Sequence, residues 1–130
     1  MAQGGRKTQL QVTHTISRTV TFADANAATG QLVGILPAGS VAHISRVLTS
    51  TAWNGTVSVA LSVGTALTGT QFINGTDVRT AAARVDTVVP IASAGPYAAD
   101  TPIYASVAFG GTTGSAGSST VVVEFCANIG

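Results

Sequence analysis

The chain has 130 residues, of which 45% are hydrophobic and only 8% are charged, with six Lys and Arg side chains against five Asp and Glu. Soluble proteins usually carry about 25% charged residues. A chain this poor in charge and this close to neutral offers no electrostatic footprint for nucleic acid, an anionic membrane or an acidic substrate.

Small polar residues take the place of charge. The sequence contains 19 threonines, 11 serines and 15 glycines, so hydroxyls and backbone amides must hydrate the surface. Threonine also favours strands, because its branched Cβ suits a pleated sheet. A near-neutral surface gives weak repulsion between copies and favours association. The length fits one domain, which can bury about two thirds of the surface of its unfolded chain.

Residues 1–8 have two glycines and no apolar anchor, so we expect a flexible N-terminal arm that carries Arg6 and Lys7 and gains order on a partner. Residues 9–130 then form a single domain. The N-terminus lacks the apolar stretch of a signal peptide, and no window approaches about 18 uninterrupted apolar residues. We therefore expect the protein to be made and kept in a cytoplasm.

Apolar residues alternate with Thr, Gln and Ser along residues 9–22, which predicts one long strand or two strands joined by a bend. His14 and Arg18 fall on the apolar face of this strand. A position at a bend or at the rim of a sheet is the first interpretation for both. The alternative is a subunit contact in which Arg18 pairs with a carboxylate.

Residues 31–36 predict a short strand that Pro37 ends, because proline lacks the N–H that a ladder needs. After a turn, residues 41–50 predict a strand whose two faces are both mixed. Such a strand suits a sheet whose outer face is partly covered, for instance by a neighbouring subunit.

Trp53, the only tryptophan, precedes Asn54-Gly55, which is the strongest short hairpin signal in the chain, and residues 56–63 then alternate as a strand. Core or edge packing is the first interpretation for Trp53. The alternatives are an interface anchor, because exposed aromatic residues concentrate binding energy, and a platform on which a sugar stacks.

Residues 64–84 are less regular: Gly69 and Asn74-Gly75 mark turns, and residues 80–84 suggest a single helical turn. Three further strands are predicted at residues 85–89, 102–109 and 120–127. Residues 92–101 between them are predicted as a loop, and the glycine- and serine-rich residues 110–119 as a flexible loop.

Seven or eight short strands without a convincing amphipathic helix predict an all-β fold, an antiparallel β-sandwich. A jelly roll of about eight strands, with the flexible arm at its N-terminus, is the form we expect. Periodicity alone does not separate that topology from other Greek-key sandwiches.

Few groups are available for chemistry. His14 and His43 lie in different strands without metal-ligand spacing, so neither a metal site nor a cofactor is predicted. Four carboxylates lie in or beside predicted loops, where a carboxylate accepts backbone N–H bonds and shapes a turn: Asp24, Asp77, Asp86 and Asp100. No catalytic signature is present, so we expect no catalytic residues and no enzyme.

The only cysteine, Cys126, cannot form an internal disulfide and lies in an apolar run near the C-terminus. We expect it to be a small core residue. A disulfide between two chains is the alternative.

Five short segments carry a resemblance to known proteins: Leu-Pro-Ala-Gly-Ser at 36–40, Thr-Ala-Trp-Asn-Gly at 51–55, Leu-Ser-Val-Gly-Thr at 61–65, Asp-Thr-Pro-Ile-Tyr-Ala at 100–105 and Thr-Val-Val-Val-Glu-Phe at 120–125. Over about residues 31–127 the chain resembles small structural proteins of tailed bacteriophages. Members of that group resemble capsid decoration, or cement, proteins: jelly-roll domains that assemble as trimers on the head lattice and brace neighbouring major capsid subunits.

The resemblance implies a structural virion protein, made in the host cytoplasm, that assembles as a homotrimer and stabilises the capsid surface by binding the major capsid protein. The residues we expect at its capsid or subunit contacts are Arg6, Lys7, His14, Arg18 and Trp53. Turn and strand motifs specify a fold better than a location. The alternative is therefore a tail- or fibre-associated carbohydrate- or receptor-binding module that uses Trp53, Tyr97 and Tyr104 as stacking surfaces.

Overall fold

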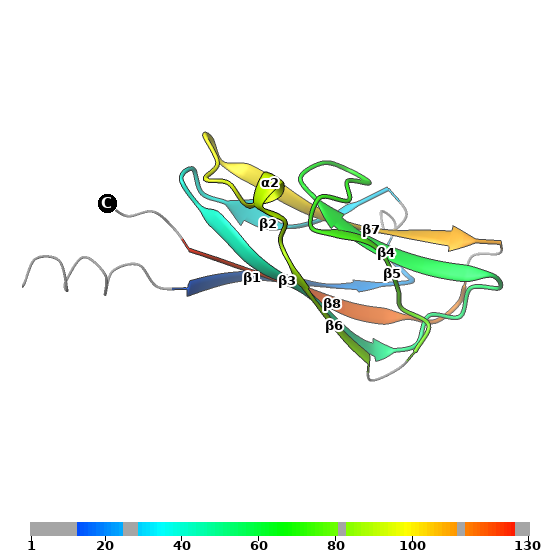
Figure 1. Cartoon of the computed structure of the whole chain (residues 1–130). Helices are drawn as coiled ribbons and strands as arrows, with labels where there is room; N and C mark the ends of the chain where they lie inside the picture. Colours follow the sequence, from blue (N-terminus) through cyan, green and yellow to red (C-terminus); the bar gives the residue numbers. More distant parts are fainter. Residues whose placement is uncertain (1–12, 25–28, 81–82, 112–113, 127–130) are drawn as a thin grey trace, which may run out of the picture.

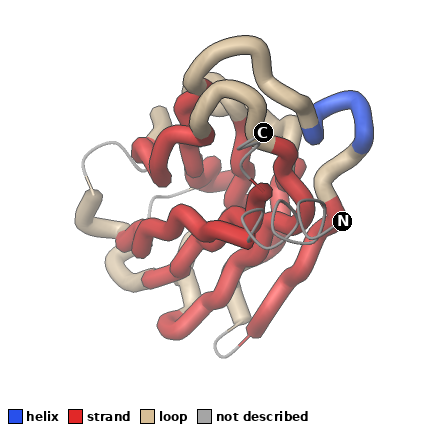
Figure 2. Tube along the Cα trace, turned by 90° about the vertical axis from the view of Figure 1, so that its left-hand side faces the viewer, coloured by secondary structure: helices blue, strands red, loops and turns tan. Residues whose placement is uncertain are grey.

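A computed structural model describes residues 13–24, 29–80, 83–111 and 114–126 of the chain. Strands make up most of this part, and the single helix in it, α2, is one turn long (Figures 1 and 2). The elements in chain order are β1 (Thr13–Thr21), β2 (Gln31–Leu36), β3 (Val41–Thr51), β4 (Ser58–Gly64), β5 (Ile73–Asp77), β6 (Ala83–Val88), α2 (Ile91–Ala94), β7 (Thr101–Gly110) and β8 (Ser118–Cys126). The predicted arm, with Arg6 and Lys7, lies outside the described residues, as do residues 9–12 of the first predicted strand.

The strands form two four-stranded antiparallel sheets, sheet A in the order β1-β8-β3-β6 and sheet B in the order β2-β7-β4-β5. Strand β1 pairs with β8, β2 with β7, β3 with β6 and β4 with β5. These four pairs are those of one long hairpin that is folded over into two layers. This topology is the jelly roll. The structure confirms the predicted antiparallel sandwich and selects the jelly roll among the Greek-key forms.

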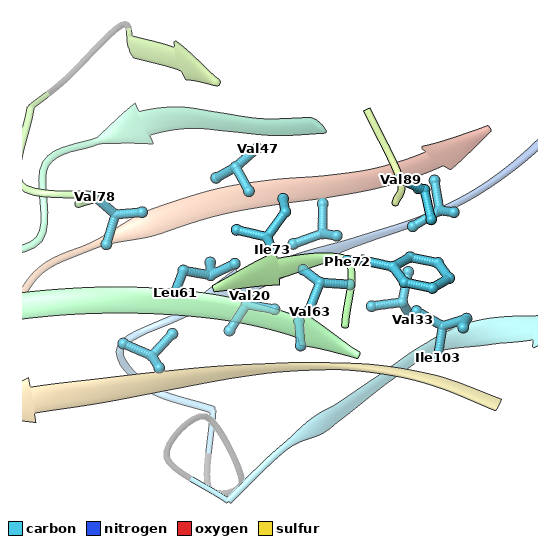
Figure 3. Close-up of a cluster of buried hydrophobic side chains, with 14 of the residues drawn as sticks. Val20, Val33, Val47, Leu61, Val63, Phe72, Ile73, Val78, Val89 and Ile103 are labelled. Atoms are coloured by element: carbon cyan, nitrogen blue, oxygen red, sulfur yellow. The ribbon is translucent and has the colours of Figure 1, made fainter. Parts of the chain in front are cut away.

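The core lies between the two sheets (Figure 3), and alternation is clearest along β8 and β4. On β8, Val121, Val123 and Phe125 point inward, and the residues between them are half-buried. Strand β4 contributes residues 59, 61 and 63 in the same way from the opposite sheet. Each fully buried Val, Leu or Ile side chain stabilises the fold by about 1.5–3 kcal/mol relative to an exposed position.

One side of the sandwich is closed by a near contact between β1 and β2. A Cβ added at Gly34 would lie 2.8 Å from the Cβ of Ile16, so only glycine lets the two strands approach this closely. On the same side, Nη1 of Arg18 donates to the carbonyl of Leu32 at 3.3 Å. These contacts join the two sheets along that side.

Trp53 is a core residue, 1% exposed, which agrees with the first interpretation of the sequence. Its indole Nε1 donates to Oγ of Ser119 at 2.9 Å, and that hydroxyl is 3.0 Å from Oγ1 of Thr49. Gly117, at φ +149°, lies against the indole so closely that a Cβ there would meet Cδ2 at 2.3 Å. The flexible loop predicted over residues 110–119 therefore contains a fixed contact at Gly117.

The prediction of a hairpin at Asn54-Gly55 is wrong. Strand β3 belongs to sheet A and β4 to sheet B, so the chain crosses between layers here. Asn54 instead ties two loops together: its Oδ1 accepts hydrogen bonds from the backbone N–H groups of Ser115 at 2.8 Å and Ala116 at 2.9 Å. The local Asn-Gly signal was correct about a change of direction but does not specify which strands pair.

Three other local predictions are wrong in whole or in part. Asn74-Gly75, predicted as a turn, lies inside β5, where Gly75 adopts φ +66° and its N–H donates to Oγ of Ser62. Of the helical turn predicted at 80–84, the described residues Ala83 and Arg84 belong to β6. Pairing with β3 overrides the intrinsic helix preference of Ala83. The loop predicted at 92–101 is wrong at its start, because residues 92–94 belong to helix α2.

Replacing Trp53 by Ala should lower the free energy of unfolding by about 3–5 kcal/mol, because it leaves a large cavity and removes the partner of Ser119. Urea unfolding followed by circular dichroism measures the change. Val57, which is 66% exposed, provides the control: its replacement by Ala should change stability by less than about 0.5 kcal/mol. Equal losses in the two variants would contradict the burial of the indole.

Candidate functional site: the surface of sheet A

Two kinds of feature are absent from the residues that the structure describes. No cluster of three or more His, Cys, Asp or Glu side chains that could hold a metal ion occurs among these residues. No helix among them is long and apolar enough to span a membrane. Charged side chains gather on the outer surface of sheet A, and this surface is the candidate site.

Three of the four loop carboxylates accept backbone N–H bonds, as predicted. The contacts are Asp24 Oδ2 with Thr21 N at 2.7 Å, Asp77 Oδ1 with Arg79 N at 2.9 Å, and Asp100 Oδ1 with Ala38 N at 2.9 Å. The prediction fails for Asp86, which lies in the middle of β6 and faces outward. Its partners are arginines, and these define the charged cluster described next.

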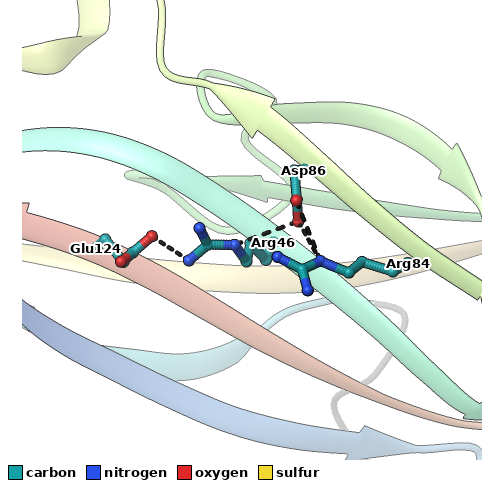
Figure 4. A network of polar contacts seen from close by, with 4 residues as sticks. All are labelled: Arg46, Arg84, Asp86 and Glu124. Atoms are coloured by element: carbon teal, nitrogen blue, oxygen red, sulfur yellow. Dashed lines mark hydrogen bonds and ion pairs between the residues drawn. The ribbon is translucent and has the colours of Figure 1, made fainter.

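Arg46, Arg84, Asp86 and Glu124 form an ionic cluster on the outer face of sheet A (Figure 4). Register explains the cluster: Arg46 of β3 lies opposite Asp86 of β6, and Glu124 of β8 lies diagonally across on the other side of β3. Nε of Arg46 is 3.3 Å from Oδ1 of Asp86, and its Nη1 donates to Glu124. Two positive and two negative charges thus neutralise one another on three adjacent strands.

Arg84 completes the cluster by donating from Nε to both carboxylate oxygens of Asp86, at 2.9 and 3.1 Å. The hydrogen bond from Arg84, aided by the charges of Arg84 and Arg46, holds the pKa of Asp86 below its usual value. The same bond raises the pKa of Arg84. The Asp86 carboxylate is therefore ionised down to lower pH than an isolated one.

The ionic cluster is bordered by apolar side chains on the same face. Leu48, next to Arg46 on the outward row of β3, is an exposed large hydrophobic residue, and Val88, two residues after Asp86, is 76% exposed. Ile91 of α2, which lies outside the sheet, is also exposed, by 93%. The exposed Leu48 and Val88 beside the ionic cluster make this face suited to contact with another protein.

Cys126 is not the core residue that the sequence predicted. Phe125 takes the inward position at the end of β8, so Cys126 faces outward and is half-buried. Its Sγ lies 3.0 Å from Nε2 of His43 and 3.9 Å from Oγ1 of Thr13. His43 and His14 do not come together.

His14 and Arg18 lie at the rim of the sandwich, as the first interpretation of their positions held. Both belong to the inward-facing row of the edge strand β1, and both are exposed. The ring of His14 lies 5.6 Å from that of Phe125, tilted by 30°. Arg18 contacts the carbonyl of Leu32 on β2, not a carboxylate. Their role in capsid or subunit contacts stays a prediction, as does that of Arg6 and Lys7.

Sequence reasoning did not select the ionic cluster as a candidate site. Alternation does put Arg46 between Ile44 and Leu48, and Glu124 after Val122, on outward rows. It does not say that β3 lies between β6 and β8, and that order alone brings the four side chains together.

Replacing Asp86 by Asn should lower the urea midpoint at pH 7, because it leaves the half-buried guanidinium of Arg46 with one counter-charge fewer. A carboxyl group whose pKa is lower in the folded than in the unfolded protein stabilises the fold at pH values above its unfolded-state pKa of about 3.9. This stabilisation is lost as the pH falls through the folded-state pKa. The difference in urea midpoint between wild type and Asp86→Asn should therefore become smaller on acidification. The control Asp77→Asn should cost less at pH 7, because its partner Arg79 is more exposed than Arg46, 41% against 24%. Equal midpoints for wild type and Asp86→Asn at pH 7 would contradict the role of the cluster.

Comparison with known proteins gives a match at the level of the fold. No protein-family model matches the chain, and no curated protein matches it by sequence. Among solved structures, a chain of the capsid asymmetric unit of cyanophage Pam1 is similar over 90% of this chain and 86% of its own length, with a TM-score of 0.68 and 19% identity.

Two further phage structures are similar. A chain in the capsid of Ralstonia phage GP4 has a TM-score of 0.66 and 18% identity, covering 92% of this chain and 86% of that one. A chain in the acidic stable capsid structure of Helicobacter pylori bacteriophage KHP30 has a TM-score of 0.59 and 14% identity over 90% and 89%. Nearly the whole jelly roll is thus shared with chains found in phage capsids.

Proposed function

We propose that this protein is a structural component of a bacteriophage virion that decorates the capsid surface and stabilises it by binding the lattice of the major capsid protein. It does so as an oligomer, and the homotrimer is the assembly that the resemblance implies. The protein is made in the host cytoplasm, and its role is mechanical and not catalytic.

The observation that carries the proposal is the end-to-end match with the Pam1 and GP4 capsid chains, which covers 90% and 92% of this chain and 86% of each of theirs. A match of this extent means that these chains have few elements beyond the shared jelly roll. Because one fold hosts many functions, the likeness supports the proposal without replacing an experiment.

The chemistry of the surface gives independent support. The chain has 8% charged residues, and the charges of the ionic cluster are mutually neutralised, so copies can lie side by side with little repulsion. Exposed apolar residues such as Val88 and Ile91 provide contact area. A lattice protein needs both properties, because it is surrounded by neighbours at very high local concentration.

The alternative, a carbohydrate-binding module of a tail or fibre, loses part of its basis. Trp53 is 1% exposed and its ring faces the core. Tyr97 is partly buried, which raises its pKa, and its hydroxyl donates to the carbonyl of Ser93. Of the three rings proposed for stacking, Tyr104 is the one on the outward row of β7, where it is half-buried. A stacking platform is better built from adjacent exposed rings.

Two measurements test the proposal. Light scattering of the purified chain should give the mass of a trimer or of a whole number of trimers, and the protein should co-sediment with capsid shells that lack it. A monomer that stays in the supernatant would contradict the proposal and would favour the tail or fibre module, which a glycan array would then examine.

Deleting residues 1–8 tests the predicted contact of Arg6 and Lys7. Their removal, or the double change Arg6→Glu and Lys7→Glu, should weaken shell binding by about tenfold or more, because charged contacts at an interface contribute roughly 1.4 kcal/mol or more in total. The matched control is Arg79→Glu, at an exposed arginine two residues after the end of β5, and this variant should bind normally. Unchanged binding of the deletion variant would exclude a docking role for the arm.

A further inference from the structure

The two sheets have four edge strands, and these edges differ in what blocks them. Strands β1 and β2 lie along the side where Gly34 meets Ile16 and Arg18 contacts the carbonyl of Leu32. On the opposite side, β5 is interrupted by Gly75 at φ +66°, and its pairing with β4 shifts register. The ladders of β2 and β5 are thus irregular, whereas β1 pairs with β8 without a register shift but is approached by β2 along part of its length.

Strand β6, the remaining edge, is regular. Its six residues pair with β3 without any register shift, from Ile44 opposite Val88 to Thr49 opposite Ala83. Within the described residues, β6 has no strand on its other side. Its exposure alternates perfectly, with Ala83, Val85 and Thr87 half-buried on the inward row and Arg84, Asp86 and Val88 exposed on the outward row. A regular edge of this kind is a template for another strand.

Charged side chains on an edge strand normally prevent such pairing. On β6, however, the order of the charges makes the strand complementary to itself. If two copies of β6 pair antiparallel around a two-fold axis through Val85, Arg84 of each copy lies opposite Asp86 of the other. A register centred on Arg84 would place two arginines opposite each other, and one centred on Asp86 would place two aspartates opposite each other. Like charges directly opposite are destabilising, whereas opposite charges stabilise a cross-strand pair.

We propose that β6 is an interaction edge whose partner is β6 of a second copy of this chain, paired antiparallel about a two-fold axis at Val85. The contact joins the two A sheets into one continuous eight-stranded sheet. Backbone hydrogen bonds supply the attraction, as in strand addition generally, and the two Arg84–Asp86 pairs select the partner and the register. A two-fold contact uses the same patch on both copies, so one self-complementary strand is sufficient.

Arg84 and Asp86 can exchange their ion pair within one chain for ion pairs between the two copies. Arg84 and Asp86 are 58% and 43% exposed, so each can meet a partner across the axis without leaving the surface. Arg46 remains beside Asp86 and Glu124 from within the chain. On the inward side, the half-buried Val85 meets its own copy, and Ala83 lies opposite Thr87. The pairing therefore covers the apolar rim that the edge leaves partly open to water.

Cysteine cross-linking tests the register directly. In a Cys126→Ser background, Val85→Cys would place two thiols on directly opposite residues, whose Cα atoms are about 4.5–5.5 Å apart, within disulfide range. Oxidation with copper phenanthroline should give a covalent dimer on a non-reducing gel. The control, Val88→Cys, lies on the same strand and is more exposed, but its two copies would be six residues out of step, about 20 Å apart. On the same gel, Val88→Cys should run at the mass of a single chain, without a covalent cross-link. Cross-linking of Val88→Cys as well as of Val85→Cys, or of neither, would overturn the proposal.

Charge reversal provides a second test that does not depend on disulfide geometry. Arg84→Asp keeps the Arg46 ion pairs but puts Asp opposite Asp twice in the paired edge. It should weaken self-association by about tenfold or more in sedimentation velocity and reduce the Val85→Cys cross-link. Asp86→Arg alone should also fail to self-associate, whereas a mixture of the two variants should form a heterodimer, because both cross-strand pairs are then opposite in charge.

Asp77→Arg and Arg79→Asp serve as controls for the charge-reversal test, since this ion pair has the same spacing but lies at the end of β5. Neither should change self-association. Wild-type association in Arg84→Asp, or failure of the mixture when both variants are folded by circular dichroism, would overturn the proposal. All these measurements use the full chain without capsid shells. The β6 contact and the proposed capsid function can therefore succeed or fail separately.

Discussion

The pairing of β3 with β8 at the centre of sheet A is the contact on which the other features depend. Its register places Thr49 opposite Ser119, and the Ser119 hydroxyl, which contacts that of Thr49, accepts the hydrogen bond from the indole of Trp53. On the outer side the same pairing brings Glu124 within reach of Arg46, and its far end puts Cys126 beside His43. A shift of one residue would send the inward row of β8 to the surface, so burial of Val121 and Val123 fixes this register.

The sequence was informative about individual strands because a two-residue period is a local signal. It placed Val121, Val123 and Phe125 on one face and Val107 and Ile103 on one face of another strand, and all five are buried. It failed where the outcome depended on distant partners. Asn54-Gly55 has the local chemistry of a hairpin, yet the two flanking strands are drawn into different sheets. Thr-Ala-Ala-Ala-Arg has the propensity of a helix, yet Arg84 pairs along β3.

The candidate site could be predicted only in part for the same reason. The rim positions of His14 and Arg18 followed from the mismatch between their polarity and the strand face on which they lie. The ionic cluster did not, because Arg46, Asp86 and Glu124 are far apart in sequence and meet only through the order β8-β3-β6. Cys126 was misassigned because an apolar neighbourhood was taken as burial, although alternation with Phe125 already implied the outward row.

Scarcity of charge gives each remaining charged residue a larger role in specificity. On a surface with many charges, one Arg and one Asp two residues apart contribute little to specificity. Charged side chains on an edge strand there simply prevent it from pairing with other strands. Here the surface is largely neutral, so Arg84 and Asp86 are the main determinants of what can pair with β6. Opposite charges on one short strand disfavour many foreign edges, and they favour the register of the same strand in which Arg84 meets Asp86. A neutral surface that tolerates close packing thus still needs a few placed charges to decide which copies meet and in what alignment.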